Sequence, residues 1–287
     1  MKKELFILYL LILAIFYSCD NSVDYNADVK IYDIYPCWSP DGSKIFFAGG
    51  GLIGVNGIYS VDLITFETEL ITDKPVDFDI SPDGEKIVYT FGGNIYIKNM
   101  SAKSDPIALT NTGNNFHPSW SNSGDWIAFD SNNDSPNGMH FVWKMRIDGS
   151  EKKRIIYTPT VGEVRQPSWF PDGTRLAVLC YVNYSAGDIG IIDTSGNLIT
   201  LTTNDSNHDI NPKVSNDGNY VVFERNENRG QVCIIKTDGT DLKILLNNYS
   251  RYPNWSNDDN QIVYTNALEG CLWVINRNGL FSYKILY

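Results

Sequence analysis

A turn sequence of the form Trp-Ser-Pro-Asp-Gly recurs along this chain and restricts its fold more than any other feature. Pro presets φ, Asp hydrogen-bonds its own backbone and Gly accepts a positive φ, so Pro-Asp-Gly favours a tight turn. Each copy precedes a short apolar run, and the turn together with the apolar residues on its two sides predicts a hairpin. The six copies begin at Trp38, Ile80, Trp120, Trp169, Val214 and Trp255. Their spacing of roughly 40 to 50 residues is that of propeller blades.

Every repeat contains further apolar runs that fit two more strands. In the first repeat these are Ile58–Val61 and Glu69–Thr72. Four strands per repeat, with no helical periodicity after the first 19 residues, predict an all-β, six-bladed propeller of four-stranded antiparallel blades. The Trp that heads four of the six copies is expected to fill space between blades rather than to bind a ligand.

The repeats resemble a known family. Pro-x-Trp-Ser-Pro-Asp-Gly, then Lys-Ile-x-Phe, Ile-Tyr-x-x-Asp and Leu-Thr, is similar to the repeats of TolB-type propellers, also called WD40-like or PD40 repeats. Residues 36–42 and 118–129 show the pattern, and 253–264 show it with Asn for Pro. The resemblance covers residues 33–287 and implies six blades. It implies little about function, because such repeats occur in TolB, peptidase propellers, a pectate-fragment lyase and many lipoproteins.

The N-terminal segment has the pattern of an export signal. Lys2 and Lys3 precede the apolar run Leu5–Phe16, which is too short to span a membrane. Ser18-Cys19 and the polar residues after it resemble a lipoprotein signal, so residues 1–19 are predicted to be a signal peptide that ends at a lipidated Cys19. An ordinary secretory signal is the alternative. Residues 20–32 would form a tether and 33–287 the propeller, in the bacterial cell envelope, at the outer membrane or the periplasmic face.

Charge and cysteine content exclude some functions. The net charge of −11 and the absence of a basic patch argue against nucleic acid as a partner. The remaining cysteines match no metal motif and are expected to be apolar core residues, with a disulfide as the alternative: Cys37, Cys180, Cys233 and Cys271. No G-x-S-x-G sequence occurs, so Ser-His-Asp catalysis is not expected.

Candidate binding residues lie three positions before each repeat's first residue, where the innermost strands would enter the central channel. These six ring residues are Tyr35, Asp77, His117, Gln166, Asn211 and Tyr252. Arg165 and Arg251 lie one position earlier, and Asp33 and Asp209 one position before that. Five ring residues precede Pro and are therefore expected to be extended. The alternative to a binding role is a polar lining for a water-filled channel.

Three loops between second and third strands should open on the same side as the ring residues. They are 49–57, 130–140 and 181–188. The sequence thus predicts a non-catalytic, lipid-anchored and monomeric propeller that binds a protein or glycan partner at its channel face, without a cofactor. In it the two Arg side chains would hold a carboxylate. The resemblance to the pectate-fragment lyase implies the alternative, a metal-dependent lyase or hydrolase for acidic sugars. That lyase holds a metal with His and Gln residues, and His117, Gln166 and His208 are similar to part of that set.

Overall fold

The structure is a computed structural model. It describes residues 34–49, 56–73, 77–101, 105–155, 161–182, 186–202, 207–226, 229–247 and 249–285, all within the unit Ile31–Tyr287. The predicted signal peptide with Cys19, the tether and Asp33 lie outside the described residues, as do parts of the loops 49–57 and 181–188. Among the described residues, no helix is long and apolar enough to cross a membrane.

The described residues form six antiparallel sheets, each made of four consecutive strands. Blade 1 contains β1 (Ile34–Trp38), β2 (Lys44–Gly49), β3 (Gly57–Asp62) and β4 (Thr68–Thr72). Blade 2 contains β5 (Phe78–Ile80), β6 (Lys86–Phe91), β7 (Asn94–Asn99) and β8 (Ile107–Ala108). Blade 3 contains β9 (Asn115–Trp120), β10 (Trp126–Ser131), β11 (Phe141–Arg146) and β12 (Lys153–Arg154).

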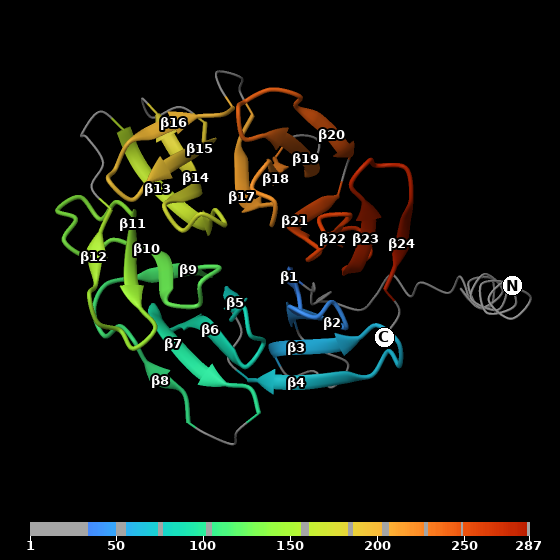
Figure 1. Cartoon of the computed structure of the whole chain (residues 1–287), viewed down its shortest axis with the longest axis horizontal. Coiled ribbons are helices and arrows are strands. Elements are labelled where there is room, and N and C mark those ends of the chain that lie inside the picture. Colours follow the sequence, from blue (N-terminus) through green and yellow to red (C-terminus); the bar gives the residue numbers. More distant parts are fainter. Residues whose placement is uncertain are drawn as a thin grey trace, which may run out of the picture. The chain divides into compact units, whose positions relative to one another are not determined.

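The second half of the propeller repeats this order. Blade 4 contains β13 (Val161–Trp169), β14 (Arg175–Val182), β15 (Asp188–Asp193) and β16 (Leu198–Thr200). Blade 5 contains β17 (Asp209–Val214), β18 (Tyr220–Arg225), β19 (Gln231–Lys236) and β20 (Lys243–Leu246). Blade 6 contains β21 (Ser250–Trp255), β22 (Gln261–Asn266), β23 (Cys271–Asn276) and β24 (Ser282–Lys284). Figure 1 shows the six blades around a central channel, with the first strand of each blade innermost. The predicted six-bladed all-β propeller is confirmed.

The recurring turn forms as its residues dictate. In the first copy, Asp41 Oδ1 accepts hydrogen bonds from Ser39 Oγ at 2.6 Å and from the backbone N–H of Ser43 at 3.0 Å. Gly42 has a φ of 73°, a left-handed conformation that other residues adopt only at a cost. The backbone N–H of Ser39 donates to Lys44 O at 2.9 Å and closes the hairpin. Each innermost strand is thereby paired with the second strand of its own blade.

The core lies between blades. Trp38 packs in a buried cluster with Val263, Leu272 and Val274 of blade 6. Trp169 donates its indole N–H to Ser119 O in blade 3 at 3.2 Å. All four repeat Trp residues are at most 8% exposed, which confirms that they fill space between blades. Among the described residues, Cys37, Cys180, Cys233 and Cys271 are free thiols, and Cys180 and Cys233 are buried.

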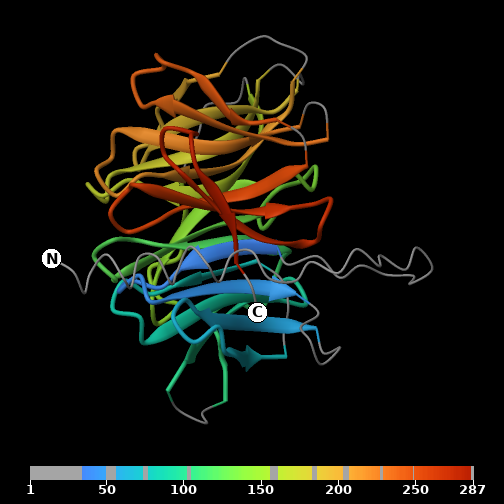
Figure 2. The same cartoon turned by 90° about the vertical axis from the view of Figure 1, so that its right-hand side faces the viewer.

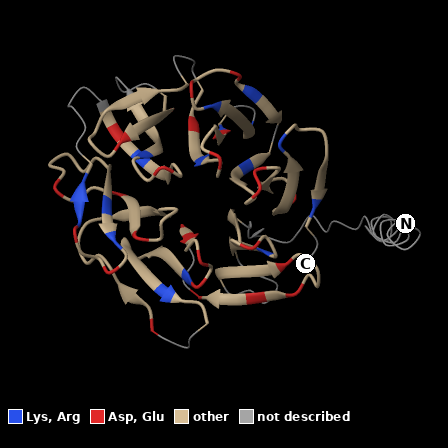
Figure 3. Ribbon diagram, viewed as in Figure 1, with Lys and Arg blue, Asp and Glu red and all other residues tan. Residues whose placement is uncertain are grey.

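The propeller closes without strand exchange, because blades 1 and 6 each consist of consecutive strands. Their contact combines the Trp38 cluster with a hydrogen bond from Asn257 Nδ2 to Ser39 O at 3.0 Å and a second to Pro40 O. Figure 2, turned by 90°, shows β1 to β3 beside the strands of blade 6. Basic and acidic residues are distributed over all the blades (Figure 3).

Candidate functional site

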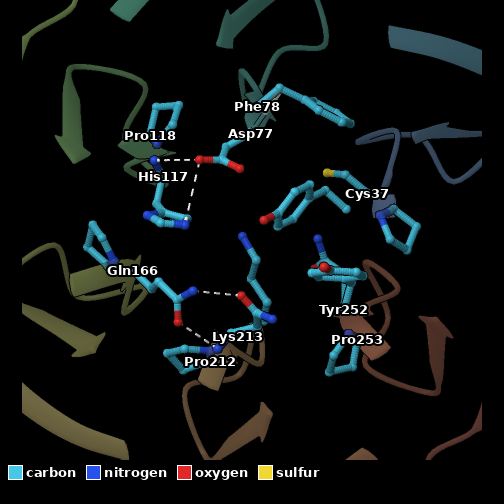
Figure 4. A pocket seen from close by; sticks show the side chains of 15 residues that line it. Cys37, Asp77, Phe78, His117, Pro118, Gln166, Pro212, Lys213, Tyr252 and Pro253 are labelled. Atoms are coloured by element: carbon cyan, nitrogen blue, oxygen red, sulfur yellow. Dashed lines mark hydrogen bonds and ion pairs between the residues drawn. The ribbon is translucent and has the colours of Figure 1, made fainter. Parts of the chain in front are cut away.

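All six ring residues line one cavity at one end of the channel. The lining consists of these residues together with Pro36, Cys37, Phe78, Pro118, Pro167, Pro212, Lys213, Pro253 and Asn254. In Figure 4 the labelled polar side chains nearest the channel centre are those of Asp77, His117, Gln166 and Lys213, together with the ring of Tyr252. This ring cavity measures about 50 Å³. It has room for roughly four water molecules, since one water needs about 10 to 15 Å³ of such space.

Five of the ring residues have a left-handed backbone, which corrects the expectation that they are extended. Their φ angles are 54° (Tyr35), 50° (His117), 53° (Gln166), 55° (Asn211) and 53° (Tyr252). The exception is Asp77, which Phe78 follows in place of a Pro. A left-handed non-glycine residue costs on the order of 1 to 3 kcal/mol, and such residues concentrate at functional sites.

A β-bulge accompanies this conformation in the innermost strand of every blade except blade 2. In blade 4, Arg165 pairs with Leu179 and Ser168 pairs with Ala177. The two residues between them on β13, Gln166 and Pro167, therefore face a single residue on β14. Equivalent register shifts occur in blades 1, 3, 5 and 6. Bulges redirect side chains. The steric effect of a following Pro predicts an extended residue only in a strand without a bulge, so it did not predict the left-handed φ of these residues.

The backbone N–H of four ring residues is held by a side chain of the preceding blade. The pairs are His117 N–H with Asp77 Oδ2 (3.1 Å), Gln166 N–H with Asp130 Oδ1 (3.0 Å), Asn211 N–H with Gln166 Oε1 (2.8 Å) and Tyr252 N–H with Glu224 Oε2 (3.2 Å). In addition, Gln166 Nε2 donates to Asn211 Oδ1 at 2.9 Å (Figure 4). These bonds fix the strained backbone and link the blades around the cavity.

Asp130 of β10 is the centre of a buried charge cluster. Its Oδ1 lies 2.6 Å from His117 Nδ1, and its Oδ2 lies 2.9 Å from His140 Nδ1 and 3.6 Å from Arg165 Nε. Burial opposes ionisation of Asp130, but His117, His140 and Arg165 outweigh it and hold the pKa of this carboxyl well below its usual range. Burial also opposes charge on His117, yet Asp130 and Asp77 raise the pKa of this imidazole.

Glu224 of β18 occupies the equivalent position two blades further on. Its Oε2 accepts a hydrogen bond from Asn211 Nδ2 at 3.1 Å, and its Oε1 lies 3.8 Å from Arg251 Nε. Burial raises the pKa of this carboxyl despite the Tyr252 N–H and Arg251. The two Arg side chains expected to hold a ligand carboxylate therefore already lie beside internal carboxylates. They remain partly exposed, at 29% for Arg165 and 39% for Arg251.

The aromatic ring residues Tyr35 and Tyr252 meet across the junction of blades 1 and 6. Their ring centroids are 4.5 Å apart with a tilt of 51°. Burial and the neighbouring Asp77 raise the pKa of Tyr35 far above its usual value, so its hydroxyl remains a neutral hydrogen-bonding group. The two rings form an apolar wall opposite the His117 side of the cavity.

Two further candidates lie away from this cavity. Asp209 forms a buried ion pair with Arg225, with both N–O distances 2.8 Å. His208 accepts the Gly187 N–H at Nδ1 (2.8 Å) and lies 3.3 Å from the Tyr181 hydroxyl through Nε2. It is not among the residues that line the ring cavity with His117 and Gln166. Within the described residues, no group of three or more His, Cys, Asp or Glu is arranged to hold a metal ion.

Sequence reasoning missed Asp130, Glu224 and His140. A signal for the first two existed, because the same position of the second strand is Ala48, Thr90, Leu179 or Thr265 in the other blades. A carboxylate at this position of a buried strand requires a cationic or hydrogen-bonding partner. The predicted loop 130–140 contains Asp130 and His140 at its two ends, although Asp130 belongs to β10.

Comparisons with known proteins agree with the fold. A model of the dipeptidyl peptidase IV N-terminal region matches residues 55–128. The Tol-Pal system protein TolB of Francisella tularensis (strain WY96-3418) is 27% identical over 218 residues, which cover 71% of this chain and 48% of that protein. The chain therefore spans about half the length of the curated relatives it matches.

Solved structures give the same result. The putative TolB from Agrobacterium tumefaciens superposes with a TM-score of 0.68 at 16% identity, covering 79% of this chain and 86% of that one. Oligogalacturonate lyase in complex with manganese superposes with a TM-score of 0.62 at 14% identity, covering 88% and 77%. Such identities indicate the fold alone. The chain described here is a six-bladed β-propeller with a polar ring at one end of its channel. Its propeller is of the TolB type.

Proposed function

We propose that this protein is a non-catalytic propeller of the bacterial cell envelope that binds a protein partner at the ring end of its channel. The observation that carries the proposal is the set of five left-handed ring residues around one cavity. A side chain of the preceding blade holds the backbone N–H of four of these five residues, as expected for a preorganised recognition surface. The 27% identical relative, a Tol-Pal system protein, supports an envelope location and a protein partner.

The size of the ring cavity favours a protein over a glycan. A space of about 50 Å³ takes the tip of one side chain or a chain terminus and leaves no room for a sugar ring. The rest of the partner would lie across the ring end, where Arg165 and Arg251 remain partly exposed. Carboxylates of the partner would compete there with Asp130 and Glu224 for the two guanidinium groups.

Site-specific photocrosslinking in the native envelope tests this proposal. A benzoylphenylalanine in place of Tyr252, at the ring, should give one defined protein adduct. The matched control replaces Tyr283 on the outermost strand β24, which is 47% exposed, and should give none. Exchanging both Gln166 and Asn211 for Ala should weaken the Tyr252 adduct severalfold. Equal labelling from both positions, or none from Tyr252, would contradict a partner at the ring.

The proposal includes a lipid anchor on Cys19. It rests on the sequence pattern of residues 1–19, and two acyl signals would make the attachment stable. Cys19→Ser should move the protein from the membrane fraction to the soluble fraction. A metal-dependent lyase or hydrolase for acidic sugars has less support, since Nδ1 of His117 is engaged by Asp130 and His208 is bonded elsewhere.

A further inference from the structure

A second and larger cavity occupies the other end of the channel, on the side of the repeated hairpins. It measures about 310 Å³. The residues directly before each repeat line it: Cys37, Asp79, Ser119, Ser168, Lys213 and Asn254. The cavity is six times larger than the ring cavity and is lined more by polar than by apolar groups. This hairpin-side cavity is large enough for a small organic ligand.

Lys213 differs from its five equivalents. The others are Cys, Asp, Ser, Ser and Asn, whose short side chains leave the channel axis open. The side chain of Lys213 extends toward that axis (Figure 4). It is the only Lys or Arg among the described residues that line either cavity. A single ammonium group is thus presented inside the channel of a protein whose net charge is −11.

The ammonium group of Lys213 has no hydrogen bond or ion pair to any residue that the structure describes. The nearest acid on this wall, Asp79, acts on it only at longer range, and the oxygens of Asp79 are already engaged. Asp79 Oδ2 accepts the Trp120 N–H at 2.7 Å, and Oδ1 accepts the Ile80 N–H at 3.0 Å. Lys213 therefore faces a cavity with its charge uncompensated at close range, a state that a bound anion would relieve.

The backbone around Lys213 is held from both sides. Lys213 O accepts the indole N–H of Trp255 in blade 6 at 3.0 Å. The N–H of Val214 donates to Ser168 Oγ in blade 4 at 3.1 Å. Lys213 and Asn254, in adjacent blades, line both cavities. The ammonium group and the Asn254 amide thus come from fixed strands where the two cavities meet, as a binding site requires.

We infer that the hairpin-side cavity is a second binding site, which takes a small ligand through its carboxylate group. The ammonium of Lys213 forms the charge-assisted hydrogen bond, and the amide of Asn254 and the hydroxyls of Ser119 and Ser168 contact the rest of the ligand. A carboxylate fits because the compact ammonium of Lys213 supplies one positive charge, which matches the single negative charge of a carboxylate. Both the free C-terminus of a short peptide and a sugar acid carry this group.

Titration calorimetry on the full propeller distinguishes these sources. The probes are an N-acetylated dipeptide with a free carboxylate, the same dipeptide with an amidated C-terminus, and glucuronate. Binding by the free dipeptide but not its amide identifies a peptide terminus, and binding by glucuronate identifies a sugar acid. Either result supports the site, and affinity should fall as salt is added. If none of the three binds at millimolar concentration, the inference is wrong.

Substitutions locate the binding. Lys213→Met should weaken it about tenfold or more, the usual effect of losing a charged hydrogen bond, and Lys213→Arg should retain most of it. Lys153→Met on the outer strand β12 is the matched control and should change nothing. Thermal unfolding checks that each variant is folded. Unchanged affinity in folded Lys213→Met would overturn the assignment. Because Lys213 lines both cavities, Ser119→Ala and Ser168→Ala, which alter only the hairpin-side cavity, separate the two sites: they should weaken carboxylate binding and leave the Tyr252 crosslink unchanged.

Discussion

At the scale of single residues, the channel depends on carboxylates placed where the repeat otherwise has apolar or hydroxyl side chains. Asp130 is fully buried and contacts two imidazoles, a guanidinium and a backbone N–H. Such a cluster is costly to desolvate and is stable only when every member is paired. His117 joins it to Asp77, whose Oδ2 lies 3.6 Å from His117 Nε2. The carboxylates of Asp130 and Asp77 therefore bind both the His117 imidazole and the backbone N–H groups of Gln166 and His117, so their protonation would affect the backbone of the ring.

The first prediction concerns pH. Asp130 has a pKa below its ordinary 3.8, so it stabilises the fold above that pH and less as pH falls. His117 has a pKa above its ordinary 6.5, so it stabilises the fold below that pH and less as pH rises through the raised pKa. We expect the cluster's contribution to unfolding free energy to be greatest between these values.

Denaturant unfolding from pH 4 to 9 measures this dependence. Asp130→Asn should lower the unfolding free energy by about 3 kcal/mol near pH 6, as for other broken buried pairs, and by less at pH 9. The control is Leu176→Ala, which removes buried side-chain atoms without removing a titratable group. It should lower the unfolding free energy by the same amount at every pH. A loss from Asp130→Asn that is the same at every pH would contradict the assignment.

At the scale of secondary structure, the innermost strand of five blades is a hairpin strand interrupted by a bulge. The Pro after each left-handed residue lacks an N–H and has a fixed φ, which suits a position with a disturbed ladder. Blade 2 lacks this Pro, and its innermost strand, Phe78–Ile80, is the shortest of the six. Asp77 there has no left-handed φ and instead supplies an acceptor to His117. The blade without the bulge thus contributes the Asp77 carboxylate, which accepts a hydrogen bond from the His117 backbone.

A prediction at this scale concerns Pro167. If the bulge already has the φ that Pro prefers, Pro167→Ala should cost only about 0.4 to 1 kcal/mol, mainly by freeing the unfolded chain. Urea unfolding measures the difference, and Pro171→Ala in the hairpin turn of the same blade provides the comparison. A loss above 3 kcal/mol would show instead that Pro167 holds the bulge in place.

At the scale of the whole molecule, the contact between blades 1 and 6 closes the ring. Elsewhere, consecutive blades are joined by the chain itself, whereas here only packing and hydrogen bonds join residues more than 200 positions apart. Local opening free energies differ across a structure, and we expect the lowest one at this junction because no chain connection joins its two sides. The Tyr35–Tyr252 contact lies at the same junction, so opening there would also disturb the ring cavity.

The prediction about closure of the propeller compares two leucines, Leu272 and Leu176, which are both fully buried. Leu272 packs with Trp38 across the junction of blades 1 and 6, and Leu176 packs across the junction of blades 3 and 4. Each change to Ala should cost about 2 to 5 kcal/mol. Only Leu272→Ala should also accelerate hydrogen exchange selectively in blades 1 and 6. Equal exchange patterns in the two variants would mean that closure is no weaker than the other junctions.

The sequence by itself determined the fold. The turn residues act locally, and the apolar runs beside each turn define strands. The four strands of each repeat, and the six repeats, could therefore be counted without knowledge of any tertiary contact. The same count located the six ring residues, because equivalent positions of a repeat meet around one axis. The repeat Trp residues were assigned to the core for the same reason, and their burial confirms it.

Only the tertiary structure decided what those positions do. The left-handed backbone at Tyr35, His117, Gln166, Asn211 and Tyr252 arises from a bulge, which depends on the register between two strands. The pairing of Arg165 with Asp130 and of Asp209 with Arg225 joins residues that the repeat pattern treats separately. Cavity sizes, and the position of Lys213 between the two cavities, depend on how six blades pack. Repetition specifies local geometry, whereas the proposed binding sites consist of residues that differ between repeats and meet only after closure.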